Sequence, residues 1–265
     1  MLRKSLPYLL FGLGVYLMFM LVRLPAVNVY GWVKSLAPEV PVILKGVQGS
    51  IWSGTASEAY IAGQNLSSLQ WELKPAWLLL GRVQLHLGLR QGESYFYGDV
   101  GRTLGNDFHF DNIDANLLLE DIQPLAKAVP LQLAGTLSLN LQQLDFEDHV
   151  VTAAEGVVAW QNAGMRTLQA MTFGNLRLEM RNSADGVTGK LSDSGDALLA
   201  DGTLELASTG SYQFAGVFMA RDRNQRALSQ SLNFLGRPGP DGKINVSRSG
   251  NLSDLGGIFA KPADS

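Results

Sequence analysis

Cysteine is absent from this chain of 265 residues, and histidine is scarce. Without cysteine the chain can form neither a disulfide framework nor a thiolate zinc site. The three histidines, His86, His109 and His149, lack the spacing of a zinc-binding pair and have no visible nucleophile to activate. A net charge of -3 does not favour a nucleic acid as a partner.

The motifs of common catalytic and cofactor sites are also missing. The sequence has no Gly-x-Ser-x-Gly nucleophile elbow and no glycine-rich stretch with the Lys-Ser/Thr of a phosphate loop. Two acidic groups, Asp111 with Asp114 and Asp193 with Asp196 and Asp201, match no calcium loop, so we interpret them as turn residues. The sequence therefore predicts no catalytic, metal-binding or cofactor-binding residue, and no enzyme.

One long apolar run, from Ser5 to Val22, carries no charged side chain. About 18 such residues allow a helix to span a bilayer. Arg3 and Lys4 precede the run, which favours a cytoplasmic tail of residues 1–4 and export of the rest. A cleaved signal peptide is the alternative, but that class has a shorter apolar core. The predicted anchor at 5–22 contributes the side chains Leu6, Leu9, Leu10, Phe11, Leu13, Val15, Leu17, Phe19 and Leu21.

An amphipathic helix is expected directly after the anchor, within residues 23–38. Its apolar face has helical spacing and comprises Val29, Trp32, Val33 and Leu36. Pro38 ends the helix, because the residue before a proline avoids the helical conformation. Such a helix would lie on the membrane surface or pack against the base of the following domain.

From about residue 40 the apolar period changes to two, which is typical of half-buried antiparallel strands. The alternating runs cover residues 69–73, 83–89, 131–141, 176–180, 212–218 and 244–246. Asp-Gly pairs at Asp185, Asp201 and Asp241 predict hairpin turns. We therefore predict a mainly β fold, with an antiparallel domain at 39–255, short helices near 121–129 and 226–235, and a tail at 256–265.

This alternation makes one face of the sheet apolar along nearly its whole length. Few helices are expected to cover that face, so the sheet must curve, fold over itself or leave an apolar groove. A curved sheet, sandwich or half-barrel is the conservative prediction, and an open groove for acyl chains is the sharper one. Gly49–Ala56 and Gly156–Ala163 each combine a glycine, a tryptophan and a small residue, which suggests two related halves.

Two surface features allow more than one interpretation. Arg221, Arg223 and Arg226 form a compact basic cluster, which is either a solvated loop or a contact for acidic lipid headgroups or an acidic partner. Trp77 begins an apolar run after Pro75 and either packs in the core, which we favour, or forms a membrane-facing lip.

Several short segments follow the short tail and single anchor in a definite order. They include Gly-Ser-Ile-Trp-Ser-Gly-Thr-Ala, beginning at Gly49, and Leu-Gln-Trp-Glu-Leu-Lys-Pro, beginning at Leu69. The residues that mark this order are Gly49, Trp52, Gly54, Trp71, Pro75, Gly81, Trp160, Gly174 and Tyr212. In these segments and their order the chain resembles the type II secretion system protein N family of Gram-negative bacteria. No catalytic motif defines this family, so no active residue is carried over.

The resemblance implies a single-pass protein of the bacterial inner membrane with a periplasmic β domain and other secretion subunits as partners. The first hypothesis is therefore a non-enzymatic accessory component of type II secretion. The alternative is a periplasmic lipid-binding or lipid-transfer protein of AsmA-like architecture, which would hold acyl chains on the apolar face of its sheet. Strand order and the sealing of that face would separate the two hypotheses.

Overall fold

A computed structural model describes most of the chain. The described residues are 12–13, 15–16, 19–20, 23–36, 42–61, 64–78, 81–103, 105, 107–122, 132–148, 150–166, 171–222, 226–233 and 235–252. Within them, no helix is sufficiently long and apolar to cross a bilayer. Most of the predicted anchor lies outside the described residues, and its described members Leu13, Val15 and Phe19 are exposed.

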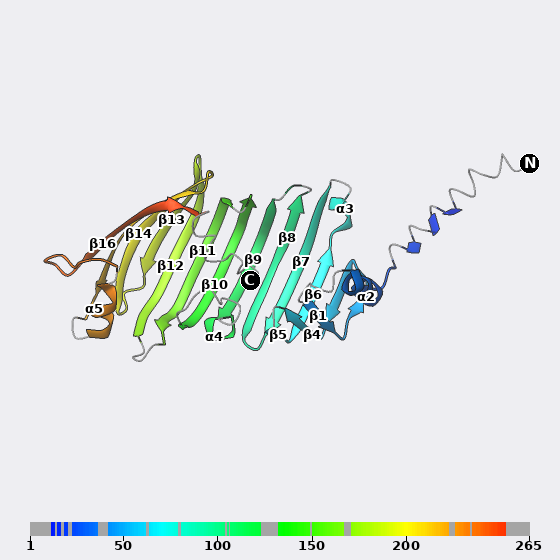
Figure 1. The fold of residues 1–265 in the computed structure, drawn as a ribbon, viewed down its shortest axis with the longest axis horizontal. Coiled ribbons are helices and arrows are strands. Elements are labelled where there is room, and N and C mark those ends of the chain that lie inside the picture. Colours follow the sequence, from blue (N-terminus) through cyan, green and yellow to red (C-terminus); the bar gives the residue numbers. More distant parts are fainter. Residues whose placement is uncertain are drawn as a thin grey trace, which may run out of the picture.

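Thirteen strands form one antiparallel sheet in the order β16-β15-β14-β13-β12-β11-β10-β9-β8-β7-β6-β3-β2. Each strand from β6 onward pairs with the next along the chain, as in a meander (Figure 1). The strands are β2 Gln48–Gly49, β3 Ser53–Ala56, β6 Ser68–Leu73, β7 Arg82–Gln91, β8 Ser94–Thr103, β9 Phe108–Leu118, β10 Leu133–Glu147, β11 Val150–Met165, β12 Met171–Ser183, β13 Gly186–Asp193, β14 Leu198–Ala207, β15 Ser211–Ala220 and β16 Ile244–Asn251.

A second, three-stranded sheet lies at the amino-terminal end of the large one. It has the order β1-β4-β5, and its strands are β1 Val42–Lys45, β4 Glu58–Ile61 and β5 Gln64–Leu66. Strand β4 contacts β6, and β5 contacts β7, so the small sheet packs beside the end of the large sheet. The described helices are α2 Ala26–Leu36, α3 Pro75–Leu78, α4 Leu119–Ile122 and α5 Arg226–Leu232.

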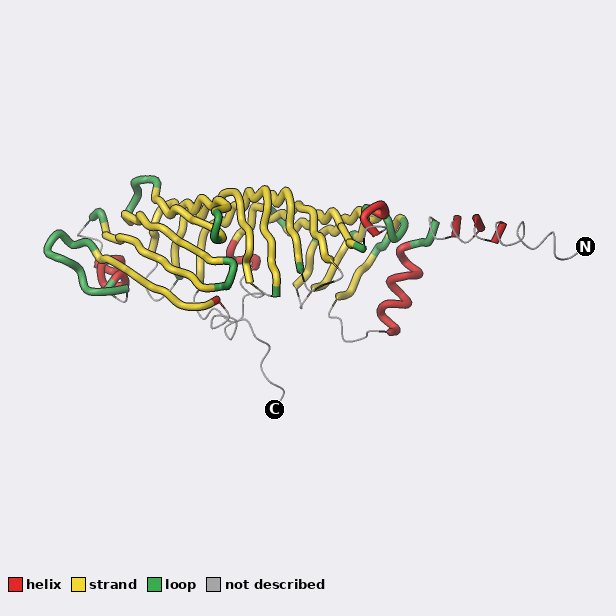
Figure 2. The backbone as a smooth tube through the Cα atoms, turned by 90° about the horizontal axis from the view of Figure 1, so that it is seen from above, coloured by secondary structure: helices red, strands yellow, loops and turns green. Residues whose placement is uncertain are grey.

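The large sheet is curved. Figure 2 shows it as an arch, with α2 near one end, α5 near the other and α4 between them on the concave side. The packing agrees, because α2 contacts β2, α4 contacts β9 and β10, and α5 contacts β12 and β15. Helices α2, α4 and α5 therefore occupy parts of one face, whereas Trp77 of α3 lies beside His109 and Asp111 on the other face.

Strand register separates the apolar and polar side chains onto opposite faces. Cross-strand partners share a face, and successive residues of a strand alternate between faces. One continuous row on the concave face is Leu69, Leu89, Phe96, Ala115, Leu139, Val158 and Leu178. A neighbouring row on the convex face is Glu72, His86, Asp99, Asp111, Gln143 and Glu155.

The described residues provide little cover for the concave face. Among the described residues, no large side chain is fully buried, which distinguishes this sheet from the closed core of a sandwich. One small core forms where Leu228 and Leu232 of α5 pack on Leu198 and Ile244. In the described part of the chain the architecture is thus a single curved layer with α2, α4 and α5 on its concave side.

The structure confirms the mainly antiparallel β fold and corrects several local predictions. The Asp185 turn joins β12 to β13, but Asp201 lies inside β14, because Gly202 packs beneath the ring of Phe214 instead of forming a turn. Helix α5 ends at Leu232, so Leu235 is exposed.

The two segments that suggested related halves occupy different kinds of element. Trp52 lies in the turn between β2 and β3, whereas Trp160 lies inside the long strand β11. The sequence similarity between these segments therefore does not correspond to equivalent positions in the sheet.

Candidate functional site

The centre of the concave face is an apolar trough formed by β8, β9, β10 and β11. Ile113, Ala115 and Leu141 are buried at its floor. Around them lie partly buried apolar side chains, namely Phe96, Phe110, Leu117, Leu139, Leu144, Val158 and Met180. These side chains stand in register on consecutive strands, so the trough runs across the strands along the length of the sheet.

At the amino-terminal end the trough leads to a cavity of about 390 Å3 beneath α2. Helix α2 contributes Ala26 and Val29 to its wall, the small sheet contributes Leu44, and the large sheet contributes Trp71 and Leu87. The helix is held over the cavity by a hydrogen bond that the Leu44 backbone N–H donates to the Tyr30 hydroxyl, at 2.9 Å. Leu87 is two residues from Leu89 of the concave row, so the cavity and the trough share one apolar face.

One charged group lines this cavity, the ammonium of Lys34, which lies 6.0 Å from the centroid of the Tyr30 ring. No carboxylate in the described part of the chain pairs with Lys34. Lys45 of β1 is different, because it forms an ion pair with Glu58 at 3.1 Å. The site thus combines an apolar cavity with one available positive charge.

The convex face carries titratable groups that form hydrogen bonds and ion pairs with one another. The Lys74 ammonium lies 3.3 Å from Asp99 Oδ1, and His86 Nδ1 lies 3.0 Å from the same oxygen. Burial opposes ionisation of Asp99, but hydrogen bonds with His86 and Lys74 outweigh it and lower the pKa of the carboxyl group. His109 similarly lies 3.0 Å from Asp145.

Asp111 lies between these two clusters and has the opposite shift. Burial raises the pKa of its carboxyl group, and the negative charges of Asp145 and Asp99 raise it further. Asp111 belongs to strand β9, so its interpretation as a turn residue is wrong. No group of three or more potential metal ligands occurs among the described residues.

The residues that carry the family resemblance are structural in their contacts. Trp71 lies over Gly54 of the neighbouring strand, where an added Cβ would overlap the indole ring, and its Nε1–H donates to the Ser50 carbonyl at 3.3 Å. Trp160 donates from Nε1 to the Ala134 carbonyl at 3.0 Å. A ring over a glycine on an adjacent strand stabilises that pairing.

Two further members of the set, Gly49 and Gly81, have positive φ angles of 89° and 69°. Tyr212 covers Gly250 of β16 in the way that Trp71 covers Gly54. Pro75 is the first residue of α3, where its missing N–H is tolerated. Of the set, only Trp71 lines the cavity, while the others shape strands and turns.

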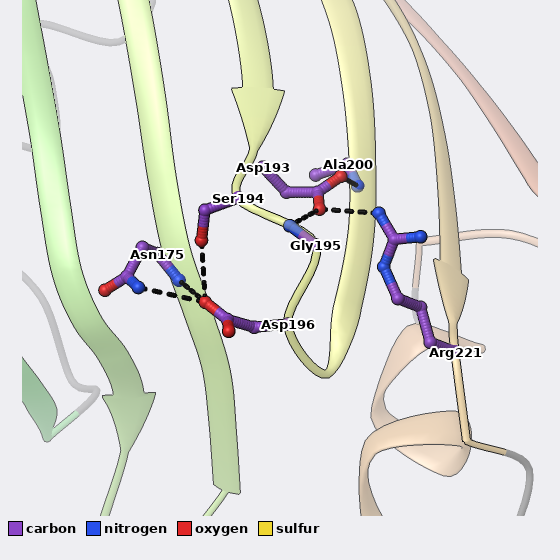
Figure 3. A network of polar contacts seen from close by, with 7 residues as sticks. All are labelled: Asn175, Asp193, Ser194, Gly195, Asp196, Ala200 and Arg221. Carbon is purple, nitrogen blue, oxygen red and sulfur yellow. Dashed lines mark hydrogen bonds and ion pairs between the residues drawn. The ribbon is translucent and has the colours of Figure 1, made fainter.

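A polar network in the β13–β14 turn gives Asp193 and Asp196 their roles (Figure 3). Asp193 accepts hydrogen bonds from the Gly195 and Ala200 backbone N–H groups, at 2.6 and 2.9 Å, and from Arg221 at 2.6 Å. Burial opposes the ionisation of Asp193, but these bonds outweigh it and lower the pKa of the carboxyl group. The interpretation as a turn residue is confirmed for Asp196, whereas Asp193 is the last residue of β13 and binds the backbone of the turn that follows.

Asp196 stabilises the other side of the same turn. It accepts from the Ser194 hydroxyl at 2.7 Å and from the backbone and side-chain N–H groups of Asn175 at 3.0 and 2.9 Å. These hydrogen bonds, led by the one from Ser194, lower the pKa of the Asp196 carboxyl group. Gly174, beside Asn175, has a φ of 94°, and an added Cβ would overlap the Asp196 side chain.

The predicted basic cluster is only partly described. Arg221 forms an ion pair with Asp193. The side chains of Arg223 and Arg226 lie outside the described residues. Trp77 lies in α3 and is 37% exposed, so its predicted core position is wrong. Sequence reasoning missed the cavity beneath α2, for which the only sign was the apolar spacing of residues 29–36.

Comparisons with known proteins agree on one family. The family model described as type II secretion system (T2SS), protein N, matches residues 41–247. A protein of Aeromonas hydrophila named type II secretion system protein N is 30% identical over 246 residues, which cover 91% of this chain and 96% of that protein. A Vibrio cholerae serotype O1 protein of the same name is 25% identical over 213 residues, covering 79% and 84%. No solved structure shows significant similarity to this chain.

Proposed function

Because this chain belongs to the type II secretion system protein N family, we propose that it is a non-enzymatic accessory component of that system in the bacterial inner membrane. It supports the export of folded proteins from the periplasm and contacts other secretion subunits. The observation that carries the proposal is coverage, since the family model extends over nearly the whole β domain. Both relatives bear the name of the same component.

The proposed topology is a cytoplasmic tail at 1–4, one membrane helix at 5–22 and a periplasmic domain at 39–255. The uncharged apolar run and the preceding Arg3 and Lys4 support this orientation. Protease treatment of spheroplasts tests it, with one epitope tag placed before Arg3 and another after Ser265. Digestion of the carboxyl-terminal tag alone is expected, whereas protection of that tag would exclude the topology.

Deletion of the gene in its native host tests the secretion role. We expect substrates of the system to decrease in the culture medium and accumulate in the periplasm, with recovery when the wild-type gene is supplied in trans. The tagged protein is expected to copurify with inner-membrane secretion subunits. Normal export after deletion, together with absence of copurification, would refute the proposal.

A second candidate function, the binding of lipid acyl chains, is supported by the trough. Leu139 and Val158 stand on the concave face next to the buried Ala115. The described helix that contacts β9 and β10, α4, has four residues and begins directly after the end of β9. Apolar surface of this extent on a soluble domain favours an apolar ligand or partner. A curved sheet open on one side can hold an extended chain along the row of side chains.

A pair of adjacent residues provides a matched test of the trough. A photoreactive amino acid replaces Leu139 on the concave face or Asn140, which is exposed and points to the opposite face. After irradiation in cells, mass spectrometry should find phospholipid attached at 139 and little at 140. Equal attachment, or none at 139, would eliminate acyl-chain binding in the trough without affecting the secretion proposal.

A further inference from the structure

The cavity beneath α2 combines an apolar lining with one lysine, which suits a particular class of ligand. We propose that it binds one acyl chain of an anionic phospholipid, with the Lys34 ammonium contacting the phosphate of the headgroup. This inference rests on the second candidate function, which it extends from the trough to a defined site. The wall of the cavity comes from α2, β1, β6 and β7, none of which belongs to the central trough.

The lining of the cavity selects an apolar group. The polar ends of its two amphipathic aromatic residues are already engaged, since Tyr30 accepts from the Leu44 N–H and Trp71 donates to the Ser50 carbonyl. Both rings therefore present apolar atoms to a ligand. A volume of about 390 Å3 lies within the range of ~300–1,000 Å3 that is typical of small-molecule sites.

The charge at the wall selects an anion. Lys34 is exposed, and the part of the chain that the structure describes offers it no carboxylate. Lysine side chains commonly pack their stem on apolar surface and keep the ammonium in water. A ligand with an apolar chain and a negative head would therefore satisfy the cavity and Lys34 together, as an acidic phospholipid does.

The position of the cavity favours a lipid from the bilayer. Residues 23–25 alone separate α2 from the predicted membrane anchor, and this link is tied to the domain. The Ile51 N–H donates to the Leu24 carbonyl at 3.1 Å, and Pro25 pairs with Ser50 as an isolated bridge. The cavity thus stands within a few residues of the predicted membrane surface, where a lipid can enter with its headgroup near Lys34.

The cavity also continues into the trough. Leu85 and Leu87 line the cavity, and Leu89 further along β7 pairs with Phe96 of β8 on the same face. An acyl chain that enters beneath α2 therefore meets apolar side chains in the direction of the central strands. An acyl chain bound in the cavity would therefore extend from the membrane end of the domain toward its centre.

Photolabelling of the full-length protein in vesicles tests the inference. The probes are phosphatidylglycerol and phosphatidylcholine, each with a diazirine in one acyl chain, and the labelled peptides are mapped by mass spectrometry. We expect phosphatidylglycerol to label α2, β1 and β7 in preference to phosphatidylcholine. Lys34→Gln should reduce that preference about fivefold, the effect of one lysine at an anionic membrane surface. Lys45→Gln, which removes the paired lysine, should leave it unchanged.

A second variant tests the cavity independently of the charge. Val29→Trp places a large side chain on the inner side of α2 and should abolish labelling beneath α2, with an unchanged thermal unfolding midpoint as the control for folding. If that variant misfolds, the exposed Lys34→Gln substitution still decides the question. Equal labelling of the cavity by both probes, with no effect of Lys34→Gln, would overturn the inference.

The remaining outcomes separate this inference from the function on which it rests. Labelling of β9, β10 and β11 without labelling of α2 would refute the cavity site and leave acyl-chain binding in the trough intact. Absence of labelling from all of these elements would refute both. Complete displacement of the phospholipid by an equimolar free fatty acid would also overturn the proposal, because it would show that the site prefers a carboxylate head to the phosphate of a phospholipid.

Discussion

The Asp193 carboxylate is the polar group whose removal should most disturb the carboxyl-terminal part of the sheet. Its side chain is only 8% exposed and joins β13, the following turn and Arg221 at the end of β15 (Figure 3). Asp193→Asn preserves the shape of the side chain but removes the charge and turns one acceptor into a donor. The substituted amide must then face an N–H group of Ala200 or the N–H groups of Gly195 and Arg221.

The size of the effect follows from the three partners. The Ala200 residue is fully buried, so an unsatisfied N–H there costs about 1–3 kcal/mol. Arg221 is partly exposed, and its lost ion pair contributes only about 0.2–1 kcal/mol. The Gly195 N–H is exposed and can bind water instead. We therefore expect Asp193→Asn to lower the free energy of unfolding by about 2–3 kcal/mol.

Urea unfolding of the full-length protein, followed by tryptophan fluorescence, measures this loss, and hydrogen exchange of the Ala200 amide measures it locally. Asp241→Asn is the matched control, because Asp241 has a 59% exposed side chain and a 3.8 Å ion pair with Lys243. It should change stability by no more than about 0.5 kcal/mol. Equal effects of the two substitutions would refute the assignment of Asp193 as the link between these elements.

The pH dependence supplies a second check with a fixed sign. The pKa of Asp193 is lower in the folded protein than in the unfolded chain, so its ionisation stabilises the fold above the unfolded pKa of about 3.9. That contribution is lost as the pH falls through the folded pKa. The difference between wild type and Asp193→Asn should therefore be constant from about pH 5 to 7 and shrink below about pH 4. A difference that grows on acidification would contradict the reasoning.

Three further substitutions test other parts of the sheet. Gly174→Ala should lower the free energy of unfolding by about 2–4 kcal/mol, because the new methyl group overlaps Asp196 and the backbone is strained. Gly195→Ala is the control, since Gly195 has a similar φ of 91° but open space around it. Thermal melts should show a loss of only about 1 kcal/mol for this control. Asp111→Asn should raise the unfolding midpoint at pH 7, because the raised pKa of the Asp111 carboxyl group means that its charged form destabilises the fold. This gain in stability should disappear as the pH falls below the unfolded pKa of about 3.9. Trp160→Phe should lower the urea midpoint by an amount equivalent to about 1 kcal/mol, the hydrogen bond to Ala134.

Much of the sheet could be predicted because alternation is a local property. The run from Val83 to Leu89 lies in β7, and the run from Leu176 to Met180 lies in β12, as their spacing indicates. The prediction of a turn at Asp201 is wrong for a nonlocal reason. Gly202 is small because the Phe214 ring of the next strand lies over it, and the same Asp-Gly pair thus serves packing rather than chain reversal.

The apolar trough was less predictable than the strands, because its exposure depends on how the strands and helices are arranged in space. Apolar alternation at Leu139 and Leu141 is compatible with a sandwich as well as with an open trough, and only the strand order of the meander separates them. Asp99 of β8 binds His86 of β7 and also Lys74, which follows the end of β6, although Lys74 and Asp99 are separated by 25 positions in the sequence. No motif spacing encodes such a contact.

Strand length explains how a single layer can be stable at its centre, where the described residues provide little cover. The longest strands, β10 and β11 with 15 and 16 residues, stand in the middle, where the four-residue helix α4 contacts β10 on the concave face. The terminal strands are shorter, and helices α2 and α5 pack near them. Long strands gain more ladder hydrogen bonds and cross-strand pairs, so the central part depends less on a second layer. The trough can therefore remain available to a lipid or a partner, because the sheet beneath it is stabilised by its own pairing.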